Sequence, residues 1–100
     1  MVRKIIWLPE AIRTYLGIID YLQSEWTEQE IAKFAELVRR KLATLEMQPR
    51  IGRRAGKKRN VFRTVVHKKV TLVYRYKPVK KEIELVTFWN NLQDPGRLKF

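Results

Sequence analysis

The sequence predicts an α+β domain in which an N-terminal helical hairpin packs on one face of a mainly antiparallel sheet. Residues 60–91 contain three short runs rich in β-branched and aromatic side chains, separated by polar breaks. Residues 9–48 instead repeat apolar side chains at steps of three and four, which is typical of amphipathic helices. The length of 100 residues fits one domain, residues 1–100, with the element order β-α-α-β-β-β.

The composition narrows the classes of function. The chain has no cysteine and a single histidine, so we expect no disulfide, no metal site and no cofactor. It has no apolar run of about 18 residues and no signal peptide, so we expect a cytoplasmic protein without a membrane span. The 22 Lys and Arg residues outnumber the 10 Asp and Glu residues, giving a formal charge of +12 that attracts polyanions and acidic proteins.

The first 48 residues are predicted to form a strand and two helices. Residues 2–8 are a short apolar run that fits a strand. Pro9 suits the first turn of a helix, and Glu10 beside it favours the positive end of the helix dipole. The apolar stripe of this helix is Ile12, Tyr15, Leu16, Ile19, Leu22 and Trp26.

Thr27 and Glu30 form a capping-box pattern that begins the second helix. Its apolar stripe is Ile31, Phe34, Val38, Leu42 and Leu45. Pro49 ends the helix. The link between the two helices is so short that they must form an antiparallel hairpin, whose apolar stripes need the sheet as a partner surface.

Residues 49–59 are the most basic segment and are predicted to be a loop. Its cations are Arg50, Arg53, Arg54, Lys57, Lys58 and Arg59. Gly52 and Gly56 would let backbone amides approach an anion, although the spacing is not that of a P-loop. We expect a loop that faces an anion, with a solvated charged loop as the alternative.

Three strands are predicted at residues 61–66, 69–76 and 82–89, with Pro78 in the second break. Alternation assigns to the helix-covered face Val70, Leu72, Tyr74, Tyr76, Ile83 and Leu85. On the other face we expect Arg63, Val65, Thr71, Val73, Arg75, Val86, Phe88 and Asn90, although alternation alone does not fix which faces of neighbouring strands lie together. His67 is expected to be an exposed residue of a hairpin turn. Trp89 has two interpretations, core packing beside Leu85 or contact with a base or partner.

Four short strings, in this order and spacing, resemble the RelE/ParE superfamily, the toxins of type II toxin–antitoxin modules. They are Leu-Pro-Glu-Ala at residues 8–11, Pro-Arg-Ile-Gly at 49–52, Leu-Val-Tyr-Arg-Tyr at 72–76 and the run at 86–95. The resemblance covers nearly the whole chain. It implies a RelE/ParE-like fold and a cognate antitoxin that wraps and blocks the toxin in a hetero-oligomer.

The resemblance also implies one of two targets. RelE-like members cleave messenger RNA on the ribosome, whereas ParE-like members inhibit DNA gyrase and catalyse nothing. A metal-free ribonuclease must move protons at the 2′ and 5′ oxygens and hold charge on the phosphate. RelE-like enzymes place an arginine two residues before the leucine of the "LVY" string, where this chain has Val70 or Thr71. They place a tyrosine or histidine near the end of the last strand, where this chain has Phe-Trp-Asn-Asn at 88–91.

The resemblance therefore favours inhibition of gyrase by binding, with RelE-type cleavage as the alternative. The residues expected to bind the target are Arg59, Arg63, Arg75, Lys77, Trp89 and Asn90. If the chain is a nuclease, the candidate catalytic residues are Lys57, Arg63 and Arg75. A further alternative is a basic nucleic-acid-binding domain without toxicity. An acidic or amphipathic antitoxin segment that folds on contact would suit the charge of the chain.

Overall fold

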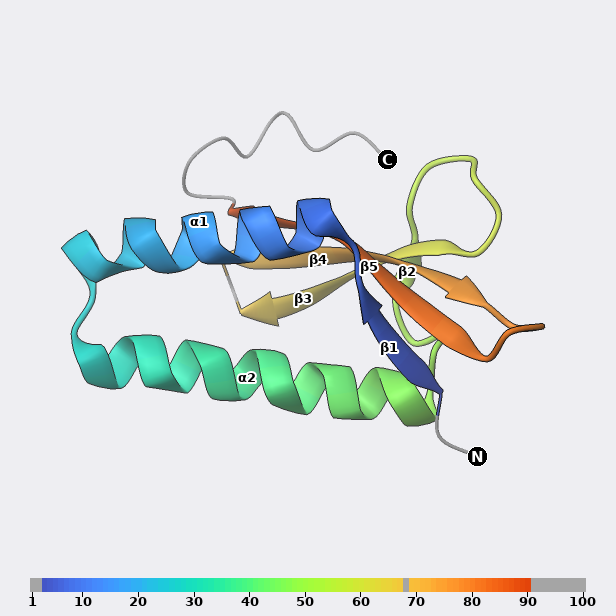
Figure 1. Cartoon of the computed structure of the whole chain (residues 1–100), viewed down its shortest axis with the longest axis horizontal. Coiled ribbons are helices and arrows are strands. Elements are labelled where there is room, and N and C mark those ends of the chain that lie inside the picture. Colours follow the sequence, from blue (N-terminus) through green and yellow to red (C-terminus); the bar gives the residue numbers. More distant parts are fainter. Residues whose placement is uncertain (1–2, 68, 91–100) are drawn as a thin grey trace.

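The computed structural model describes residues 3–67 and 69–90. Its elements are β1 (Lys4–Trp7), α1 (Pro9–Glu25), α2 (Glu28–Met47), β2 (Arg53–Arg54), β3 (Val61–His67), β4 (Val70–Lys77) and β5 (Glu82–Asn90). Figure 1 shows α1 and α2 side by side and antiparallel, covering one face of a twisted sheet. The predicted α+β architecture and the helical hairpin are confirmed.

Both helices begin as the sequence predicts. Pro9 occupies the first turn of α1, with Glu10 next to it. The Thr27 hydroxyl accepts a hydrogen bond from the Glu30 backbone N–H at 3.2 Å, and the Glu30 carboxylate accepts one from the Thr27 N–H at 3.1 Å. This complete capping box satisfies two N–H groups at the start of α2 that would otherwise lack a partner. Neither helix of the described residues is long and apolar enough to cross a bilayer.

The sheet has the strand order β1-β5-β4-β3-β2. The strands β2 to β5 pair antiparallel, and β1 pairs parallel with β5, aligning Lys4 with Glu82 and Trp7 with Leu85. Strand β2 lies within the segment that the sequence predicts to be a loop. It was missed because two residues are too short for an alternation pattern, and its pairing with β3 defines it instead.

The main core lies between the helices and the sheet. Its fully buried large side chains include Phe34, Leu22, Leu45, Leu72, Tyr74, Ile83, Leu85 and Phe88. The predicted stripe of α1 is partly wrong, because Ile12 and Leu16 are 45% and 55% exposed. Ala11 and Ile18 face the core in their place, so the helix is rotated relative to its most apolar stripe.

A register shift between β4 and β5 changes the face assignment at the end of β5. Tyr74 pairs with Leu85, but the preceding residue, Val73, pairs with Thr87, so one residue of β5 is extra. Such a bulge reverses the alternation beyond it. Phe88 and Asn90 therefore lie on the helix-covered face, and their predicted place on the other face is wrong. Trp89 pairs with Thr71, so its expected packing beside Leu85 is also wrong.

Candidate functional site

The face of the sheet opposite the helices, called here the open face, carries two of the predicted arginines. Val61 pairs with Arg75, and Arg63 pairs with Val73, so these four residues share one face. Arg53 of β2 pairs with Arg63 and adds a second cation beside it. Arg63 is exposed. The predicted placement of Arg63 and Arg75 on the face away from the helices is confirmed.

A small apolar cluster attaches the basic segment to the open face. Ala55, Val61 and Val73 are buried together, with Val86 packed against them. The Ala55 backbone N–H also donates to the Val61 carbonyl at 2.8 Å. The basic segment is therefore anchored to the sheet at Ala55, and its charged residues project from a fixed base.

A buried tyrosine holds the start of the same segment. The Tyr74 hydroxyl donates to the Pro49 carbonyl at 2.8 Å and accepts from the Gly52 N–H at 3.1 Å. Burial raises the pKa of Tyr74, so the hydroxyl stays protonated and able to donate. A Cβ at residue 52 would lie 2.7 Å from this hydroxyl and 2.8 Å from the Arg63 carbonyl oxygen, so glycine is required by close approach. Two of the strings that carry the resemblance, at 49–52 and 72–76, are thus in direct contact.

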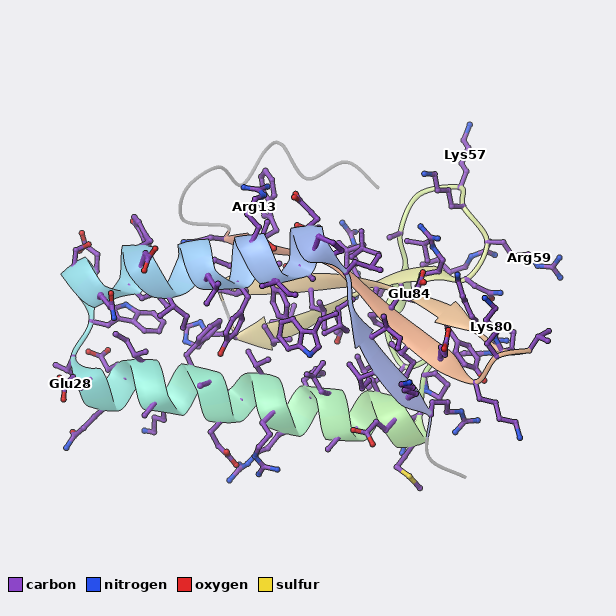
Figure 2. All side chains as sticks on the ribbon, in the orientation of Figure 1. Arg13, Glu28, Lys57, Arg59, Lys80 and Glu84 are labelled. Atoms are coloured by element: carbon purple, nitrogen blue, oxygen red, sulfur yellow. The ribbon has the colours of Figure 1, made fainter. Side chains whose placement is uncertain are left out.

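One groove collects cations from three segments and is called here the basic groove. It has a volume of about 680 Å³ and is lined by Arg50, Arg59, Asn60, Arg75, Tyr76, Lys77, Pro78, Val79 and Lys80. Three of the predicted target-binding residues, Arg59, Arg75 and Lys77, meet here. Figure 2 shows Arg59 and Lys80 at the same end of the molecule, far from Glu28 at the other end.

A single carboxylate contacts two cations of the basic groove. Glu84 Oε1 lies 3.5 Å from Arg75 Nη1, and Glu84 Oε2 lies 3.1 Å from Lys77 Nζ. The Glu84 side chain is only 13% exposed, while those of Arg75 and Lys77 are 42% and 33% exposed. Glu84 therefore orients both cations from below and offsets one of the two charges, leaving the groove positively charged.

Arg50 is held at the wall of the basic groove by two contacts. Its Nη1 donates to the Asn60 side-chain oxygen at 3.1 Å, and its guanidinium lies 5.1 Å from the centre of the Tyr76 ring. The Arg3 guanidinium is 5.9 Å from the same ring. Cation–π contacts of this kind orient a guanidinium without neutralising it. Asn60 has a positive φ of 60°, a conformation that asparagine tolerates better than most residues.

The remaining predicted site residues lie elsewhere. Lys57 projects from the basic segment (Figure 2). Arg63 stands on the open face, and neither residue is among those that line the basic groove. Trp89 is half-buried opposite Thr71. Asn90 is buried and lines a separate hollow beside Thr14 and Gly17 of α1.

His67 is not an exposed turn residue, so that prediction is wrong. Its ring lies 5.1 Å from the Trp26 ring and 6.1 Å from the Phe34 ring, at the end of the helical hairpin where α1 connects to α2. Its Nδ1 accepts from the Lys69 backbone N–H at 3.2 Å. His67 thus closes one end of the core.

Two cations of the basic groove, Arg50 and Lys80, were not singled out from the sequence as target-binding residues. The pairing register of the β3–β4 hairpin is the feature that would have indicated this groove. Pairing Val61 with Arg75 places residues 59 and 60 beside residues 76 and 77, and the following turn brings residue 80 to the same end. Fixing that register from the sequence would have predicted most of the groove.

The overall arrangement is that of bacterial toxins with a RelE-type fold. A double mutant of the E. coli toxin RelE in the free state superposes with a TM-score of 0.65 at 12% identity, covering 95% of this chain and 90% of that one. The toxin–antitoxin complex RelBE2 of Mycobacterium tuberculosis gives a TM-score of 0.59 at 13% identity, covering 90% and 99%. At these identities the likeness establishes the fold alone.

The sequence itself identifies the family. No curated protein matches the chain. The family model described as the ParE toxin of the type II toxin–antitoxin system parDE matches residues 5–95. The chain therefore belongs to the ParE toxin family and is a toxin of a type II toxin–antitoxin system. The resemblance to the RelE/ParE superfamily is confirmed.

Proposed function

We propose that this toxin inhibits DNA gyrase by binding to it and that a cognate antitoxin neutralises it. The match to the ParE family model over residues 5–95 carries the proposal. The long helical hairpin, with helices of 17 and 20 residues, supports it, because such a hairpin is more typical of ParE-like than of RelE-like chains.

The chemistry of the open face also favours binding over cleavage. General acid–base catalysis requires a group that exchanges a proton near the reacting oxygens. Glu84 is a carboxylate in contact with two of the predicted cations, and its two oxygens are engaged by Arg75 and Lys77. At the position where RelE-like enzymes carry an arginine, Val70 and Thr71 are buried. This arrangement supplies positive charge that can hold an anion. Among the described residues it offers no evident acid or base to transfer a proton.

The antitoxin is proposed to be an acidic, amphipathic segment that folds on the exposed edges of the sheet and helices. It forms a hetero-oligomer with the toxin in the cytoplasm. The formal charge of +12 attracts an acidic chain. Ile12 and Leu16, one helical turn apart and about half exposed on α1, offer apolar contacts to the same partner. A segment of this kind spreads its ordering entropy over a large contact area.

The test is to incubate the purified chain with gyrase, ATP and relaxed plasmid, and to map messenger-RNA ends in cells after induction. We expect loss of supercoiling, a DNA-damage response and no cuts at codon boundaries. Coproduction of the protein encoded by the neighbouring gene should restore growth. The Lys33→Ala variant removes one exposed cation from α2. It serves as the control for Arg63→Ala and Arg75→Ala, each of which also removes one positive charge.

Two other results would reject the proposal. Codon-boundary cuts that disappear in Arg63→Ala or Arg75→Ala, with supercoiling intact, would identify a ribosome-dependent endoribonuclease. Salt-dependent nucleic-acid affinity without growth arrest would identify a basic binding domain that is not toxic.

A further inference from the structure

We propose that the basic groove binds the phosphodiester backbone of duplex DNA. This inference rests on the proposed function, because the duplex in the cell would be the DNA that gyrase holds. It assigns to the toxin a direct contact with nucleic acid in addition to its contact with the enzyme.

The charges of the basic groove fit an anion with several negative groups. Five cations line it, namely Arg50, Arg59, Arg75, Lys77 and Lys80, and no carboxylate is among the lining residues that the structure describes. Glu84 offsets about one of these charges from below. Arg59 and Lys80 are exposed and carry no ion pair with another described residue, so their charges are available to a ligand.

The charged side chains that line the basic groove are all hydrogen-bond donors, which suits a ligand made of acceptors. The Asn60 side-chain oxygen, an acceptor, is occupied by Arg50 at 3.1 Å. The five charged side chains contribute guanidinium and ammonium groups, which donate and do not accept. Phosphate oxygens are acceptors only, and arginine donors match their geometry.

The aromatic residue of the basic groove indicates contact with the backbone and not with the bases. Base recognition by stacking needs an open aromatic face. Tyr76 is only 7% exposed, and the guanidiniums of Arg3 and Arg50 lie 5.9 and 5.1 Å from the centre of its ring. The ring therefore orients cations, and the groove should bind duplexes of any sequence equally well.

An acidic peptide is a weaker fit to the same groove. Peptide recognition combines charge with apolar pockets that take alternate side chains. The apolar residues here are Pro78 and Val79 at the hairpin tip, and Val79 is 96% exposed, so it forms no enclosed pocket. The groove offers charge and donors without such an anchor.

The experiment measures binding of a fluorescein-labelled 12-base-pair duplex to the full chain by anisotropy over a range of salt concentrations, without gyrase. Five groove cations less one carboxylate predict a slope of log K against log salt of about −3 to −4. Arg59→Ala and Lys80→Ala should each weaken binding about three- to fivefold, equally on unrelated sequences, and reduce the slope by about 1.

Two further variants test the location of the site. Glu84→Gln releases Arg75 and Lys77 from their shared carboxylate and should tighten binding about threefold. Lys33→Ala removes the same single charge as Lys80→Ala, but at the cleft beside Trp26 and Phe34, and should leave binding unchanged. Circular dichroism of each variant checks that the fold is retained.

Three results would overturn the inference. Equal losses for Lys33→Ala and Lys80→Ala would show a diffuse charge effect. Weaker binding by a folded Glu84→Gln would exclude the proposed geometry. A glutamate-rich peptide of equal charge that binds more tightly than the duplex and responds to the same variants would reassign the groove to an acidic protein. Because gyrase is absent, failure here is separate from failure of the supercoiling assay.

Discussion

The helix-covered face and the open face of the sheet are built from the same strands but are filled in different ways. The covered face is packed with large apolar side chains, including Leu72, Tyr74 and Phe88. Among the described residues, the open face has a small apolar cluster around Ala55 and Val73, and its margin carries arginines and lysines. Stability is therefore concentrated on one face, which leaves the other free to carry charges that would repel one another in a core.

The largest expected effect tests the covered face. Phe34→Ala removes a fully buried ring that contacts the rings of Tyr15 and Trp26, and it should lower the free energy of unfolding by about 3–5 kcal/mol. Denaturant titration measures this change. Val65→Ala, at a side chain that is 58% exposed on the open face, should stay within about 0.5 kcal/mol of the wild type. Similar losses for both would contradict the division between the faces.

The next effect concerns the contact between Tyr74 on the covered face and the start of the basic segment. Tyr74→Phe leaves the Pro49 carbonyl and the Gly52 N–H without their partner and should cost about 1–3 kcal/mol. Gly52→Ala forces a Cβ against the Tyr74 hydroxyl and should cost about as much. The double variant should cost less than the sum, because removing the hydroxyl relieves part of the clash. Strict additivity in chemical unfolding would show that the two groups do not interact.

A second glycine provides a contrast of opposite sign. Gly17 lies inside α1, and a Cβ there would meet nothing within 4 Å. Gly17→Ala should therefore stabilise the protein by about 0.5–1 kcal/mol, because alanine loses less backbone entropy in a helix. A melting temperature below that of the wild type would show that residue 17 is crowded after all.

The smallest effect is on the outer surface of α2. A hydrogen bond from Arg39, with Arg40 nearby, lowers the pKa of Glu36 to about 2 from an ordinary 4.5. A lowered carboxyl pKa stabilises the fold above the ordinary value, and this contribution is lost as the pH falls from 4.5 towards 2. The melting temperature of the wild type should thus drop more than that of Glu36→Gln across this range.

Because Glu36 is exposed, this difference should be small and should shrink in high salt. Parallel pH profiles for the two proteins at low salt would rule out the contribution of Glu36.

The element types could be predicted from the sequence because they depend on local patterns. The capping box at Thr27 and the alternation of residues 70–76 are examples. The error at Phe88 has a different origin. A bulge shifts the alternation by one residue, and it is defined by pairing with β4, which lies outside the local pattern. The two-residue strand β2 was missed for the same reason.

The candidate site was predicted in part, since Arg59, Arg75 and Lys77 do meet in the basic groove. Arg50 was grouped only with the basic loop because its role depends on Tyr76 and Asn60, which are 26 and 10 positions away. Its orientation is a property of tertiary packing. Composition could indicate an anion-binding surface but could not locate the groove within it.

The pairing of β1 with β5 has a consequence for how this protein is made. The first strand of the chain binds the last described strand, so a nascent chain cannot close its sheet until β5 has left the ribosome. Products of interrupted synthesis would lack the neighbour of both β1 and β4. A toxin with this strand order can therefore become active only after β5 has been synthesised.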